Sequence, residues 1–143
     1  MKQNETLNIQ QLNEFCTQLA KNISEPTLIT LEGNLGSGKT QFTNFLVSAL
    51  TNKEISHSPT FSIINEYKGW ELPIFHIDLY RLESQSDLES TGFWDLFDEE
   101  ALIIIEWSNL LEDSYYPQNW PRKHFNFAHI EGETNKRQLT LRT

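Results

Sequence analysis

Cysteine and positive charge are both scarce in this chain. A lone cysteine, Cys16, excludes an internal disulfide and a multi-cysteine zinc site. It falls on the apolar face of a predicted helix, which favours inert packing over reactivity. No apolar run approaches the roughly 20 residues that span a bilayer, and Met1 to Glu5 do not begin a secretory signal. We therefore expect a cytoplasmic protein without membrane association.

The shortage of positive charge limits what the chain can bind by itself. Its 11 lysines and arginines face 20 aspartates and glutamates, which gives a net charge of −9. A protein that grips nucleic acid alone normally carries a basic patch. A role in nucleic-acid chemistry would therefore need a partner that supplies the positive surface.

One segment, Gly33 to Thr40, matches the pattern G-x-x-x-x-G-K-[ST] of a phosphate-binding loop (P-loop). Its glycines allow backbone N–H groups to converge on phosphate oxygens. Lys39 adds a mobile positive charge, and the Thr40 hydroxyl can ligate Mg²⁺. We predict that ATP or ADP is held by the loop residues Asn34, Leu35, Gly36, Ser37, Gly38, Lys39 and Thr40.

The flanks of the loop support this assignment. Thr27 to Leu31 form a β-branched apolar run typical of a strand. After the loop, apolar residues recur with helical spacing at Phe42, Phe45, Leu46, Ala49 and Leu50. A helix that begins at the loop directs its unpaired N–H groups at an anion. The order of strand, loop and helix therefore favours nucleotide binding over a chance glycine-rich turn.

The remaining pattern predicts a single α/β domain of 143 residues, a P-loop NTPase-like fold with three layers and a mixed central sheet. Asn8 and Gln11 suit a capping box at the start of the first helix. Helices are expected near residues 9–23, 40–50 and 84–97, the last broken near Gly92. Strands are expected near residues 27–31, 61–67, 74–79, 101–105, 125–130 and 138–141.

Two carboxylates, Glu106 and Asp78, stand at the ends of predicted strands. Ligands of open α/β sheets bind beyond the carboxyl ends of the strands. One acid could therefore hold Mg²⁺ while the other orients or deprotonates the attacking water. The alternative for each is an ordinary solvated carboxylate, and the sequence does not divide the two roles.

Other polar and aromatic positions keep two interpretations. Ser58 to Phe61 could sense the γ-phosphate or simply form a turn before a strand. Trp107 is expected in the core, because tryptophan is highly buried on average, with an exposed contact surface as the alternative. The four histidines show no metal-ligand spacing, and His76 is expected to be a strand residue rather than a ligand.

Four motifs in register resemble the bacterial TsaE (YjeE) family. Leu31 to Thr40 is similar to its loop L-x-G-D-L-G-A-G-K-T, with Asn34 and Ser37 in place of the usual aspartate and alanine. The others are S-P-T-F…N-E-Y at residues 58–67, H-x-D-L-Y-R-L at residues 76–82 and I-E-W at residues 105–107. The family's threonine near the adenine aligns with Leu12, so no adenine contact is assigned.

The resemblance implies the ATPase component that makes threonylcarbamoyladenosine (t6A) in tRNA. It implies a TsaD-type transferase and a TsaB-type scaffold as partners, with tRNA contacted only through the complex. ATP and Mg²⁺ would be the cofactors. Lys39 would then hold phosphates, Thr40 and Glu106 would hold Mg²⁺, Asp78 would assist hydrolysis, and Trp107 would lie near the nucleotide.

Two other functions stay open: a small-molecule kinase and a nucleotide switch that does not hydrolyse ATP. Kinases usually hold donor and acceptor with basic groups, whereas this chain has four arginines (Arg81, Arg122, Arg137 and Arg142) and no arginine-rich lid segment. An arginine finger contributes roughly 10³–10⁵ to the rate of such reactions, and no arginine lies in the loop. We therefore expect slow hydrolysis by the chain alone and stimulation by partners.

Overall fold

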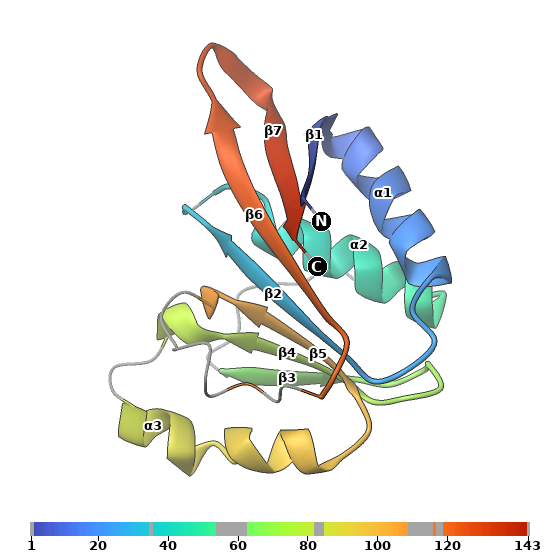
Figure 1. Cartoon of the computed structure of the whole chain (residues 1–143), viewed down its shortest axis with the longest axis vertical. Helices are drawn as coiled ribbons and strands as arrows, with labels where there is room; N and C mark the ends of the chain where they lie inside the picture. Colours follow the sequence, from blue (N-terminus) through green and yellow to red (C-terminus); the bar gives the residue numbers. More distant parts are fainter. Residues whose placement is uncertain are drawn as a thin grey trace.

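The computed structural model describes residues 2–34, 36–53, 63–81, 85–108, 116 and 119–142. Within them, seven strands form one mixed sheet in the order β1-β7-β6-β2-β5-β4-β3, with helices on both faces (Figure 1). The elements are β1 (Lys2–Asn8), α1 (Ile9–Lys21), β2 (Thr27–Gly33), α2 (Lys39–Thr51), β3 (Ile64–Tyr67), β4 (Ile74–Asp78), the 3₁₀ helix η1 (Leu79–Arg81), α3 (Gln85–Ser90), the 3₁₀ helix η2 (Phe93–Asp98), β5 (Leu102–Glu106), β6 (Arg122–Ile130) and β7 (Glu133–Arg142).

The middle of the sheet is parallel. β5 lies between β2 and β4 and pairs in parallel with both, and all five of its residues are buried. This confirms the central strand that the apolar run predicts, because strands covered on both faces read as continuous apolar sequence. β3 and β4 form the expected antiparallel hairpin.

Side-chain alternation along these strands separates two hydrophobic cores. On β5, Leu102 and Ile104 belong to the core under α1 and α2, whereas Ile103 and Ile105 belong to the core under α3 and η2. The helices therefore cover opposite faces, as the three-layer prediction requires. Because successive side chains point to opposite faces, Glu106 lies on the α2 side of the sheet.

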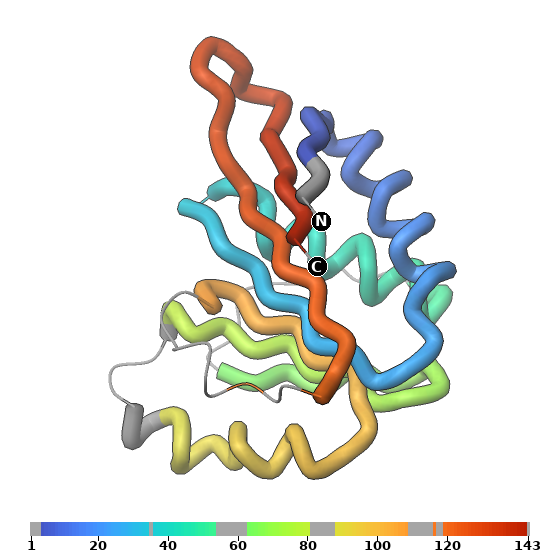
Figure 2. The backbone as a smooth tube through the Cα atoms, in the orientation of Figure 1, coloured from blue at the N-terminus to red at the C-terminus, as the bar shows by residue number. Residues whose placement is uncertain are grey.

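The antiparallel part of the sheet is built from the two ends of the chain. β7 pairs antiparallel with β6 and with β1, from Lys2 opposite Arg142 to Asn8 opposite Lys136. The termini therefore lie side by side (Figure 2). The sequence does not predict β1, since its polar residues lack an apolar pattern and the strand is placed by backbone pairing along β7.

The first helix begins as its sequence predicts. The Gln11 N–H donates to Asn8 Oδ1 at 2.8 Å, and the Asn8 N–H donates to Gln11 Oε1 at 2.9 Å. Such a cap stabilises a helix by about 1 kcal/mol. Cys16 is fully buried against α2, where its thiol contacts the Phe42 carbonyl, and burial raises its pKa. This confirms inert packing. Across the described residues, no helix has the length and apolar character needed to cross a membrane.

Candidate functional site

The loop that matches the P-loop pattern connects β2 to α2 and bends through glycines. Gly33, Gly36 and Gly38 have φ angles of 152°, 73° and 113°, which residues with a Cβ rarely adopt. A Cβ on Gly33 would lie 2.7 Å from both the Phe127 carbonyl oxygen and Ser37 Oγ. The helix cap is Gly38, so no side chain caps the first N–H groups of α2. They are therefore available to an anion.

The Lys39 side chain is folded into the loop. The residue is only 5% exposed, and Nζ donates to the Asn34 carbonyl at 3.0 Å and to Ser37 Oγ at 3.3 Å. Burial lowers the pKa of Lys39, while Glu106 and Asp78 raise it to a lesser extent. A desolvated cation held by neutral acceptors gains from an anionic ligand. This environment suits phosphate oxygens.

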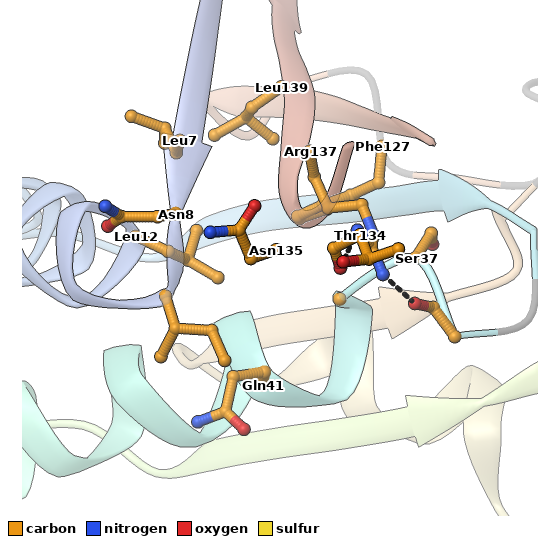
Figure 3. A pocket seen from close by; sticks show the side chains of 13 residues that line it. Leu7, Asn8, Leu12, Ser37, Gln41, Phe127, Thr134, Asn135, Arg137 and Leu139 are labelled. Atoms are coloured by element: carbon orange, nitrogen blue, oxygen red, sulfur yellow. Dashed lines mark hydrogen bonds between the residues drawn. The ribbon is translucent and has the colours of Figure 1, made fainter. Parts of the chain in front are cut away.

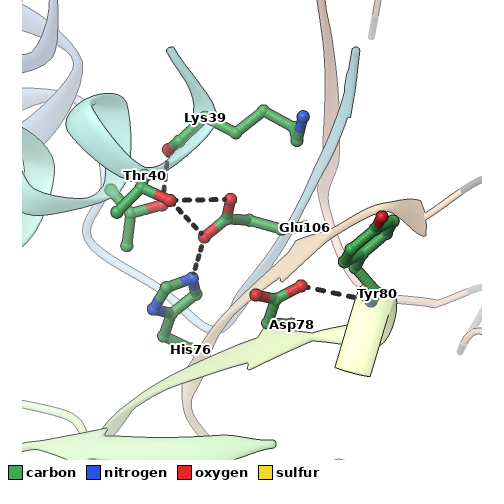
Figure 4. Close-up of polar contacts among 7 residues, drawn as sticks. Lys39, Thr40, His76, Asp78, Tyr80 and Glu106 are labelled. Carbon is green, nitrogen blue, oxygen red and sulfur yellow. Dashed lines mark hydrogen bonds and ion pairs between the residues drawn. The ribbon is translucent and has the colours of Figure 1, made fainter. Parts of the chain in front are cut away.

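Thr40 and Glu106 meet at the start of α2. The Thr40 hydroxyl donates to Glu106 Oε1 at 3.2 Å, and Glu106, at the end of β5, is 3% exposed (Figure 4). Mg²⁺ binds oxygen at about 2.0–2.1 Å in octahedral geometry, which puts neighbouring ligand oxygens about 3 Å apart. The pair therefore fits two adjacent metal ligands.

The described residues contain no group of three or more His, Cys, Asp or Glu side chains arranged to hold a metal. Mg²⁺ commonly binds through one or two carboxylates and completes its shell with phosphates and water. Thr40 and Glu106 could supply two such oxygen ligands to a metal.

Asp78 lies beside Glu106 on the neighbouring strand. The two residues are direct register partners in the parallel pairing of β4 with β5, so alternation puts them on the same face. Asp78 is half-buried, and its Oδ1 accepts the Tyr80 N–H at 3.1 Å (Figure 4). Both acids line a hollow of about 430 Å³ together with Lys39 and Thr40. The structure thus brings together the two acids that the sequence selects.

Trp107 differs from its expected place in the core. It is half-buried, its φ of 62° is left-handed, and its ring stacks on Tyr80 with centroids 4.7 Å apart. One side packs against the core under α3, and the side chain also lines the hollow, with Lys39 Nζ 4.0 Å from the ring centroid. Trp107 is therefore partly packed in the core and partly exposed as a contact surface. Leu35 and the segment Ser58 to Phe61 lie outside the described residues.

A second cavity, of about 220 Å³, adjoins the loop at Gly36 to Gly38 (Figure 3). Its apolar walls include Leu7, Leu12, Phe127 and Leu139, and its polar lining includes Asn8, Gln41, Asn135 and Arg137. Arg137 Nη2 donates to the Gly36 carbonyl at 3.4 Å. Sequence reasoning missed this cavity, because β1, α1, β6 and β7 come together only in the folded chain.

The fold and the loop define the class of the protein: a P-loop NTPase-like α/β domain. A family model described as "Threonylcarbamoyl adenosine biosynthesis protein TsaE" matches residues 6–139, and the chain belongs to this family. The resemblance drawn from the four motifs is confirmed.

Individual relatives agree with the family model. The protein named tRNA threonylcarbamoyladenosine biosynthesis protein TsaE from Bacillus subtilis is 36% identical over 114 residues, covering 80% of this chain and 68% of the relative. The protein of the same name from Nostoc sp. is 33% identical over 126 residues, covering 86% and 74%. The crystal structure of Bacillus subtilis YdiB superposes with a TM-score of 0.67 at 26% identity, covering 99% of this chain and 84% of that one.

Proposed function

We propose that the chain binds ATP with Mg²⁺ and hydrolyses it slowly, as the ATPase component of t6A biosynthesis. The observation that carries the proposal is the convergence of Lys39, Thr40 and Glu106 where α2 begins and β5 ends. The names of the Bacillus and Nostoc relatives support the pathway. Bound Mg²⁺ would neutralise phosphate charge, and the chain's own residues would bind and orient the nucleotide.

Burial separates the roles of the two acids. Glu106 is almost fully buried and contacts Thr40, which suits a metal ligand held in one position. Asp78 is more exposed, and its Oδ1 is fixed by the Tyr80 N–H. A fixed, accessible carboxylate suits a residue that orients or deprotonates water. We therefore assign Glu106 to the metal and Asp78 to the attacking water.

The 220 Å³ cavity is our proposed site for the nucleotide base. A purine has apolar faces and polar edges, and the cavity offers apolar walls with amide side chains such as Gln41 and Asn135. It shares Gly36, Ser37 and Gly38 with the hollow that contains Lys39. A nucleotide could therefore place its base in the cavity and its phosphates in the hollow. Leu12, which aligns with the family's threonine, is part of the wall.

The scarcity of positive charge around the hollow supports our proposal that hydrolysis depends on partners. Among the described residues that line the hollow, the one cation is Lys39, and none is an arginine. Arg137 reaches the loop, but it lines the base cavity rather than the hollow with Glu106 and Asp78. We propose that a TsaD-type transferase and a TsaB-type scaffold supply the missing positive charge and the contact with tRNA. The net charge of −9 agrees with this.

A steady-state hydrolysis assay tests the proposal. The purified chain is measured alone, with the transferase–scaffold pair, and as the Lys39→Ala variant with that pair. We expect slow turnover alone, faster turnover with the pair and none above background for the variant. Rapid turnover by the chain alone, unchanged when the pair is added, would refute partner dependence. Binding without turnover in every condition would favour the nucleotide switch, and phosphorylation of a metabolite from a panel would favour the kinase.

A further inference from the structure

The Glu106 carboxylate has a contact on the side away from Lys39. His76, on the neighbouring strand β4, forms a hydrogen bond through Nε2 to Glu106 Oε2 (Figure 4). Both side chains are buried, with exposed fractions of 3% and 4%. The same carboxylate accepts the Thr40 hydroxyl, at 3.2 Å to Oε1 and 3.5 Å to Oε2. The carboxylate is therefore held from two directions.

Strand register explains why His76 and Glu106 meet. Asp78 is opposite Glu106 in the parallel pairing of β4 and β5, and His76 is opposite Ile104, two residues earlier on each strand. Residues two apart on a strand point to the same face. His76 therefore lies on the same face as Glu106, two residues before the end of β4. A carboxylate only accepts hydrogen bonds, so His76 Nε2 carries the hydrogen and donates it to Glu106.

We propose that His76 is a positioning residue for the metal ligand Glu106. This inference rests on the proposed function, in which Thr40 and Glu106 hold Mg²⁺. Turning the carboxylate would break its hydrogen bond to His76 and leave a buried charge without that donor. The bond therefore keeps one carboxylate oxygen facing Thr40 before any metal arrives. Residues that orient a metal ligand typically contribute about 10–100-fold to metal affinity.

The test compares three variants of the full chain. His76→Leu removes the donor, and His76→Gln places an amide N–H close to the position of Nε2. His124→Gln is the matched control, because His124 is a strand histidine that contacts Glu32 and Thr30 rather than Glu106. The affinity of Mn²⁺ for the ADP-bound protein is measured by electron paramagnetic resonance. ADP affinity in EDTA and the thermal unfolding profile monitor the fold.

We expect His76→Leu to weaken Mn²⁺ binding about 10–100-fold while ADP affinity in EDTA stays unchanged. His76→Gln should recover most of the loss, and His124→Gln should match the wild type. If the leucine variant does not fold, His76→Asn replaces it with the same expected loss, because its shorter amide does not reach Glu106.

Wild-type Mn²⁺ affinity in the leucine variant would overturn the inference and leave the proposed function intact. An equal loss in the leucine and glutamine variants would also overturn it, since the effect would then follow packing rather than the donated hydrogen bond. If the wild-type chain itself showed no ADP binding, or no Mn²⁺ binding to its ADP complex, the result would refute the proposed function on which the inference rests.

Discussion

The two parts of the sheet contribute different chemistry to the same loop. The central strands β4 and β5 end in the carboxylates Asp78 and Glu106, which line one hollow with Lys39 and Thr40 from the start of α2. The terminal strands β1, β6 and β7 supply apolar walls such as Leu7 and the amide side chain of Asn135. The proposed phosphate end of the site is thus polar and built from two neighbouring strands and the start of α2. The proposed base end is largely apolar and built from the two ends of the chain.

The two ends of the proposed site therefore depend on different parts of the sheet. Parallel register alone brings Asp78 beside Glu106, so the phosphate end follows from the sheet. The base end needs β7 to pair with β1 across the whole length of the sequence. Substitutions among the central strands should therefore alter metal binding and hydrolysis. Substitutions among the terminal strands should alter affinity for the base or stability.

The largest effect is expected from the central acids. Asp78→Asn should lower partner-stimulated turnover by about 10²–10⁴-fold while ATP binding persists, because it removes the group that orients or deprotonates water. Glu106→Gln should lower turnover and also remove the Mg²⁺ dependence of ATP binding. Steady-state kinetics and calorimetry over a range of Mg²⁺ concentrations measure both. Asp98→Asn, an exposed acid on η2, is the control. Full activity and normal Mg²⁺ dependence in Glu106→Gln would reverse the assignment of the two acids.

A smaller effect is expected at the base cavity. Asn135 is exposed on β7 and lines the cavity, so Asn135→Trp should fill it without disturbing the core. ATP affinity should fall about tenfold, or ~1.4 kcal/mol, whereas affinity for inorganic tripolyphosphate should not change. Gln138→Trp, exposed on the same strand but outside the cavity, should leave both affinities unchanged. An equal loss for ATP and tripolyphosphate would place the base elsewhere.

The smallest effect concerns pH and the terminal strands. Burial, aided by Arg142 and Arg122, lowers the pKa of His124 below its ordinary value of 6.5, although Glu32 opposes the shift. The folded state therefore favours the neutral ring, whose stabilisation is present above pH 6.5 and is lost as pH falls toward the lowered pKa. The melting temperature should drop more between pH 7.5 and 5.5 for the wild type than for His124→Gln. Identical drops would show that His124 does not contribute.

The central strands could be predicted from the sequence more fully than the terminal strands. The central elements were predictable because apolar runs and glycine spacing are local, as Leu102 to Ile105 and Gly33 to Gly38 show. β1 was not predictable, since it is a polar strand placed by backbone pairing with β7 and its own sequence lacks an apolar pattern. The contact of His76 with Glu106 was also missed, because it depends on which strands are neighbours. The partial exposure of Trp107 depends on its left-handed backbone and on Tyr80, which the pattern does not reveal.

In the proposed function, Lys39 and the loop bind the phosphates of ATP. Calorimetric titration of ATP with Mg²⁺ into the wild type and Lys39→Ala, paired with thermal unfolding, tests it most directly. A charge-assisted contact is worth roughly 1.5–3 kcal/mol, so affinity should fall about tenfold to a hundredfold. The melting temperature should stay equal or rise, because burial lowers the pKa of Lys39 and its charge therefore opposes folding below pH 10.5. Unchanged affinity in Lys39→Ala would show that the loop does not hold the phosphates of ATP in the proposed way.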